Sequence, residues 1–217
     1  MKHLAILFDL DGTLLDTLED LADSMNATLR SLGQPVHELD AYRLFVGDGV
    51  ENLVRRALPD RARQDEKLVR DAVTAMRAEY GVRWHNKTRP YEGISELLPS
   101  ARARGLKLAI LSNKPHAATQ RVVEHFFPAF PFEAVLGARP GVPIKPDAGA
   151  ALGVARSLAL SPSQFLYLGD TNTDMETAVS AGMYPVGVLW GFRQAEELKS
   201  AGAQVLVRHP RQVLTLV

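Results

Sequence analysis

The sequence predicts an α/β protein with a doubly wound parallel-sheet, Rossmann-like core and a helical cap inserted after the first strand. Three observations predict it. Short runs of β-branched and aromatic apolar residues recur along the chain and end in small or polar turns. Helical patterns separate most of these runs, and one long helical stretch interrupts the alternation early. The 217 residues are 46% hydrophobic, which is enough apolar material for a substantial core.

The expected strands are six apolar runs. They are apolar on both faces, which is typical of strands buried inside a parallel sheet. They cover residues 4–8, 106–111, 134–136, 165–168, 184–189 and 204–207. Expected helices between them cover residues 93–104, 116–125, 147–158 and 174–181. This alternation favours an open, doubly wound sheet.

The interruption covers residues 14–87, where no convincing strand is found. Apolar residues recur there at helical spacing, for example at Leu18, Leu21, Ala22, Met25 and Leu29. We therefore expect an α/β catalytic core from residues 1–14 and 88–217, with a helical cap from residues 15–87.

Composition excludes several classes of protein. Lys and Arg together number 25, as do Asp and Glu, so the charge balance favours neither nucleic acid nor a membrane surface as partner. There is no cysteine, which rules out disulfides and thiolate metal sites. The apolar run at residues 4–8 is too short for a signal peptide or a membrane span. We expect a cytoplasmic protein.

Polar residues follow the expected strands where ligands bind in such sheets, beyond the carboxyl ends of the strands. These segments are residues 9–13, 112–114, 145–146 and 169–174. Mg²⁺ prefers carboxylate and carbonyl oxygens, and two neighbouring carboxylates can divide the work of nucleophile and proton carrier. A lysine adds positive charge, while hydroxyl and backbone N–H groups hold phosphate oxygens. The combination indicates phosphoryl transfer to an aspartate.

The strings FDLDGT, SNK, KPD and GDTNTD stand in the order and spacing of four signature motifs, and here the chain resembles the haloacid dehalogenase superfamily. The match covers nearly the whole chain. TRPYEG, LSNKP, AGM and VGVLWGF resemble, more narrowly, the phosphoglycolate phosphatase branch.

The resemblance implies a role for each motif acid and for one lysine. Asp9 is the expected nucleophile and a metal ligand. Asp11 is the expected general acid and base, and its backbone carbonyl is a further metal ligand. Lys145 stabilises charge, and Asp170 holds Mg²⁺. Asp174 orients either the waters of the metal or Lys145.

Thr13, Ser112 and Asn113 are expected from the same resemblance to bind phosphate. Gly47, Asp48 and Gly49 form a candidate cap loop facing the substrate, and a simple turn between two helices explains the same three residues equally well.

The function implied is Mg²⁺-dependent hydrolysis of a small phosphorylated metabolite such as 2-phosphoglycolate, through an aspartyl-phosphate. Asp11 argues against a dehalogenase, which by the resemblance has another residue there. A phosphosugar mutase, or another small-molecule phosphatase of the same fold, remains the alternative, and a non-catalytic phosphometabolite-binding protein is a third. Either a monomer or a homodimer is compatible with the sequence.

Overall fold

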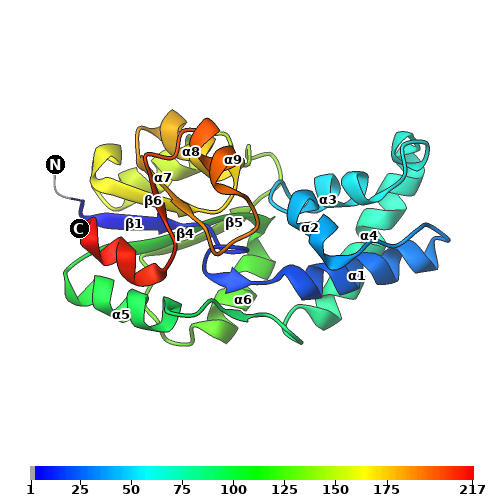
Figure 1. The fold of residues 1–217 in the computed structure, drawn as a ribbon, viewed down its shortest axis with the longest axis horizontal. Coiled ribbons are helices and arrows are strands. Elements are labelled where there is room, and N and C mark those ends of the chain that lie inside the picture. Colours follow the sequence, from blue (N-terminus) through cyan, green and yellow to red (C-terminus); the bar gives the residue numbers. More distant parts are fainter. Residues whose placement is uncertain (1–2) are drawn as a thin grey trace. The chain divides into compact units, whose positions relative to one another are not determined.

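The computed structural model describes residues 3–217 and confirms the α/β fold. Six parallel strands form one sheet in the order β5-β4-β1-β6-β7-β8, so β1 lies inside the sheet between β4 and β6 (Figure 1). The chain divides into two compact units. One comprises Met1–Leu15 with Pro90–Val217, and the other is Asp16–Arg89.

All six expected strands are present in the first unit. They are β1 Ala5–Phe8, β4 Lys107–Pro115, β5 Ala134–Ala138, β6 Phe165–Gly169, β7 Tyr184–Val188 and β8 Val205–Val207. The four residues of β1 are completely buried, as expected for a strand covered on both faces. In its register, Ile6 lies opposite Leu108 on one side and Leu166 on the other.

Helices cover both faces of this sheet (Figure 1). They are α5 Ile94–Ala103, α6 His116–Phe126, α7 Gly149–Ser157, α8 Asn172–Ala181 and α9 Ala195–Ser200, with short 3₁₀ turns at Pro162–Gln164 and Pro210–Thr215. Leu7 and Tyr167 of the sheet form one buried cluster with Val154 of α7 and Ala178 of α8. This apolar layer fixes the strands whose ends carry the polar motifs.

Among the boundaries that differ from the sequence prediction, two have a local reason. Strand β4 continues to Pro115 instead of ending at Leu111, with a break in register between these two residues. Helix α8 begins two residues before Asp174, because Thr171 caps it: Asp174 N–H donates to Thr171 Oγ1, and Thr171 N–H donates back to the Asp174 carboxylate.

The second unit is helical, as expected. It contains α1 Leu18–Ser31, α2 Leu39–Phe45, α3 Val50–Ala57, a 3₁₀ turn at Ala62–Gln64, and α4 Glu66–Arg83. Two short strands, β2 Leu15–Asp16 and β3 Arg89–Pro90, pair where the chain passes between the units, and the sequence did not predict them. Within residues 3–217, no helix combines the length and apolar character needed to cross a bilayer.

A buried carboxylate joins the two ends of the second unit. Asp20, in the first turn of α1, is 1% exposed. It accepts hydrogen bonds from Lys87 N–H at 3.0 Å, Thr88 N–H at 2.8 Å and Thr88 Oγ1 at 2.7 Å. The segment that leaves the unit is therefore attached to the helix that enters it.

Candidate active site

The polar motifs lie at the carboxyl ends of the three central strands. Asp9 directly follows β1, and its N–H donates to Leu168 O of β6 at 2.9 Å. Asp170 follows β6, and the end of β4 carries Ser112 and Asn113. The strand order changes direction at β1, since β4 and β5 follow on one side of it and β6, β7 and β8 on the other. In open α/β sheets, ligands bind at such a point, beyond the carboxyl ends of the strands.

Lys145 is the buried centre of the charged cluster. Its Nζ lies 2.8 Å from Asp9 Oδ1 and 2.6 Å from Asp174 Oδ1. Burial alone would lower the pKa of Lys145, but the negative charges of Asp174 and Asp9 outweigh it, so the pKa stands well above its usual value. Lys145 is therefore a fixed positive charge beside Asp9.

The surroundings of Asp9 disfavour its ionised form. Burial raises its pKa well above the usual value, and the nearby negative charge of Asp174 raises it further, while Lys145 opposes both effects. The acids around Asp9 thus carry more negative charge than one lysine can compensate.

Asp170 is held from two directions. Its Oδ1 accepts from Thr13 Oγ1 and its Oδ2 from Phe192 N–H, both at 2.9 Å. Burial, and then the charge of Asp174, raise the pKa of Asp170 to about 7, although both hydrogen bonds act in the opposite direction.

Two glycines let the backbone approach Asp170 closely. A Cβ on Gly12 would lie 2.2 Å from Asp170 Oδ2, and Gly12 also has a φ of +93°. A Cβ on Gly191 would lie 2.3 Å from Asp170 Cβ and 2.4 Å from Gly12 O. Any side chain at either position would displace the carboxylate or the backbone that frames it.

The buried acids fit a hard cation. Asp9, Asp170 and Asp174 each offer a carboxylate oxygen, and these atoms lie within 4.8 Å of one another. Such all-oxygen donors suit Mg²⁺. Its charge would relieve the repulsion among these carboxylates, which adds to the effect of burial in raising the pKa of Asp9 and Asp170. Both carboxylate oxygens of Asp174 already have protein partners, because Lys145 contacts its Oδ1 while Thr171 Oγ1 donates to its Oδ2.

Asp11 lies apart from this cluster and has its own lysine. Lys114 Nζ lies 2.7 Å from Asp11 Oδ1 and 2.8 Å from Oδ2. The two predicted carboxylates of the reaction therefore have different cationic partners, Lys145 for Asp9 and Lys114 for Asp11.

The three residues expected to bind phosphate have other contacts in this structure. Thr13 Oγ1 donates to Asp170, and Ser112 Oγ accepts from Lys114 N–H at 3.2 Å. The Asn113 side chain forms two hydrogen bonds with the main chain of Lys145, accepting at 2.9 Å and donating at 3.1 Å. Phosphate binding by these residues stays a prediction, and Asn113 has the additional effect of fixing Lys145.

The candidate cap loop belongs to the second unit. Gly49 stands at the start of α3 with a φ of +86°, and Gly47 has a φ of +128°. Asp48 forms an ion pair with Arg56, which also donates to Phe45 O at 3.1 Å. Arg56 therefore attaches the loop to the second unit. That the loop faces the substrate stays a prediction.

Sequence reasoning missed two contacts at the site. Lys114 had no predicted role. It directly follows Ser112 and Asn113 at a strand end, and this position could have indicated that its side chain belongs to the site. Trp190 donates from Nε1 to Thr13 O at 2.9 Å and so fixes the loop that follows Asp9.

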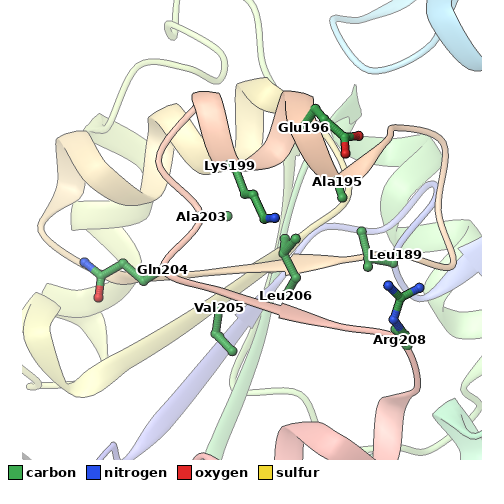
Figure 2. A pocket seen from close by; sticks show the side chains of 9 residues that line it. All are labelled: Leu189, Ala195, Glu196, Lys199, Ala203, Gln204, Val205, Leu206 and Arg208. Atoms are coloured by element: carbon green, nitrogen blue, oxygen red, sulfur yellow. The ribbon is translucent and has the colours of Figure 1, made fainter.

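A separate pocket of about 520 Å³ lies beside α9 and β8 in the first unit (Figure 2). Its lining includes Glu196 and Lys199 from α9 and Leu206 from β8, with Arg208 just beyond that strand. None of its lining residues is one of the predicted site residues, so this pocket is no part of the charged site.

Known proteins resemble this chain over most of its length. The family model described as haloacid dehalogenase-like hydrolase matches residues 6–188. A phosphoglycolate phosphatase of Pseudomonas putida is 31% identical over 96% of this chain and 78% of its own. One from Colwellia psychrerythraea is 32% identical over 92% of this chain and 90% of its own.

A solved structure agrees with these similarities. The crystal structure of a candidate phosphoglycolate phosphatase from Lactobacillus delbrueckii subsp. bulgaricus has a TM-score of 0.91 with this chain at 30% sequence identity. The match covers 98% of this chain and 97% of that one.

Proposed function

Since this chain belongs to the haloacid dehalogenase-like hydrolases and is a phosphatase, we propose that it hydrolyses 2-phosphoglycolate through a phosphorylated Asp9. The observation that carries the proposal is the buried contact between Asp9 and Lys145 at the end of β1. Relatives named phosphoglycolate phosphatase support the choice of substrate.

In the first step, Asp9 attacks phosphorus and the ester bond to the leaving alcohol breaks. Lys145 contacts Asp9 Oδ1, so we assign the attack to Oδ2. The Lys145 ammonium favours the ionised form of Asp9, against the effect of burial, and offsets the negative charge that a phosphate brings to it.

Asp11 moves the protons in both steps. It gives a proton to the oxygen of the leaving alcohol, and then takes one from the water that attacks the phosphorylated Asp9. The second transfer regenerates both carboxyl groups and releases phosphate, so no other reactant is consumed.

Mg²⁺ is the cofactor we propose for this site. Asp9, Asp170 and the backbone carbonyl of Asp11 would hold it, while Asp174 keeps Lys145 in place. When bound, Mg²⁺ supplies positive charge that lowers the repulsion between a phosphate ester and the carboxylates.

We assign the helical insertion, residues 15–87, the role of a cap. A phosphate site made of strand-end loops needs protection from water, because water weakens every charge interaction that the reaction uses. The loop of Gly47, Asp48 and Gly49 is the segment we place on the leaving-group side.

The test is phosphate release from a panel of phosphorylated metabolites with Mg²⁺ and with excess chelator. We expect 2-phosphoglycolate to be a preferred substrate and Asp9→Asn to lose essentially all turnover while remaining folded. Asp71→Asn, on the exposed surface of α4, is the matched control and should keep full activity. A substrate isomer formed without free phosphate would instead establish a mutase.

A further inference from the structure

Lys114 forms a close, largely buried ion pair with Asp11. The Nζ atom contacts both carboxylate oxygens, at 2.7 and 2.8 Å, and the two side chains are 6% and 14% exposed. Within residues 3–217, no other group hydrogen-bonds the Asp11 carboxylate. The nearly equal distances place the ammonium between the two oxygens, so this ion pair holds the carboxylate group in place in front of Lys114.

The backbone of Lys114 is itself fixed on both sides. Its N–H donates to Ser112 Oγ at 3.2 Å, and its carbonyl accepts from Thr119 Oγ1 at 3.1 Å. Gly137 of β5 packs so closely that a Cβ there would lie 2.5 Å from Lys114 O. The break in register of β4, between Leu111 and Pro115, lies around this residue. The ammonium therefore extends from a rigid support that includes the predicted phosphate residue Ser112.

We propose that Lys114 is a positioning residue for Asp11, which it holds at the place needed to exchange a proton with the leaving oxygen. The inference rests on the proposed function. By this inference the two lysines of the site have different roles, since Lys145 contacts Asp9 and Asp174 while Lys114 contacts Asp11. The proton still passes only between Asp11 and the leaving oxygen or the attacking water, and Lys114 keeps its own protons throughout.

The chain contains no cysteine, which permits a direct chemical test. In Lys114→Cys, alkylation with bromoethylamine rebuilds a side chain of lysine length that ends in an ammonium group. Alkylation with bromoethane adds an uncharged group. Wild-type protein treated with bromoethylamine is the reagent control. Lys199→Cys, on the exposed surface of α9 and treated in the same way, is the matched control for the modification.

With 2-phosphoglycolate, which has a poor alkoxide leaving group, we expect Lys114→Cys to lower kcat about 10- to 100-fold, because proton transfer depends on position. The loss should be several-fold smaller with p-nitrophenyl phosphate, whose leaving group needs little protonation, and KM should change little. Aminoethylation should restore most of kcat, and ethylation should not. In an Asp11→Asn background, Lys114→Cys should cause little further loss, because both changes remove one function.

Equal losses for both substrates, a raised KM and full additivity with Asp11→Asn would overturn the inference and indicate that Lys114 binds the substrate directly. An unaltered kcat in Lys114→Cys would overturn it as well. Circular dichroism and melting temperature check folding, and Lys114→Gln, which keeps a donor toward Asp11, provides a second variant with an expected intermediate kcat. Failure of the proposed function looks different, since the wild-type protein would then release no phosphate from 2-phosphoglycolate, or Asp9→Asn would keep its turnover.

Discussion

The Asp20 carboxylate gives a sharp prediction for the stability of the helical unit. Asp20→Ala removes the acceptor of three donors: Lys87 N–H, Thr88 N–H and Thr88 Oγ1. Hydrogen bonds to a charged group contribute about 1.5–3 kcal/mol each, and buried donors left without an acceptor cost about 1–3 kcal/mol. Since water can reach exposed Lys87 more easily than buried Thr88, we expect a total loss of about 3–5 kcal/mol.

Asp23→Ala is the matched control, because it removes a carboxylate that also contacts Lys87. Its Oδ2 lies 2.8 Å from Lys87 Nζ, but the two side chains are 50% and 47% exposed. A solvated pair of this kind contributes less than about 1 kcal/mol.

Urea unfolding followed by circular dichroism measures both losses, and amide hydrogen exchange locates them. In Asp20→Ala, the Thr88 amide should exchange much faster than in wild type, while in Asp23→Ala it should not. If both variants unfold at the same urea concentration, or if the Thr88 amide stays equally protected, the reasoning about this buried carboxylate is wrong.

Three further predictions concern the metal and the cap. Mg²⁺ should activate phosphate release and Ca²⁺ should inhibit it, because Ca²⁺ takes a larger and looser ligand shell; full activity in excess EDTA, measured by phosphate release, would contradict this. In EDTA, Asp170→Asn should melt above wild type near pH 7.5 and much closer to it near pH 5. The raised pKa of Asp170, about 7 against a usual 3.8, keeps a proton on the folded protein that the unfolded chain has lost, so wild-type stability falls as pH rises between these values. Replacing Gly47 or Gly49 by Val should change the ranking of substrates with a small change in melting temperature, whereas lowered stability with the same ranking would make the loop purely structural.

Much of the core could be predicted because its signals are local. Each strand is a run of apolar residues, and parallel strands present their carboxyl ends at one edge. It follows that residues after β1 and β6 must lie together, and Lys145, which contacts both Asp9 and Asp174, fits that expectation. Strands of two residues, such as β2 and β3, carry no periodicity and leave no such signal.

Pairings between distant side chains could not be predicted in the same way. Lys114 reaches Asp11 across 103 positions of sequence because β4 continues past Leu111 with a change of register, which no apolar pattern encodes. Asp20 resembles an ordinary acid in the first turn of a helix, and only the return of the chain at Thr88 shows its buried role.

The tight contact of Gly12 and Gly191 with Asp170 has a consequence for how this sequence can change over generations. Both positions lack any reactive group, yet a single methyl group at either would disturb a proposed metal ligand as severely as losing it. The obstacle at Gly191 includes main-chain atoms of Gly12, so a compensating exchange of one neighbouring side chain cannot repair it. In a library containing every single substitution, these two chemically silent positions should be depleted as completely as the aspartates. New specificities must then arise through mutations elsewhere in the chain.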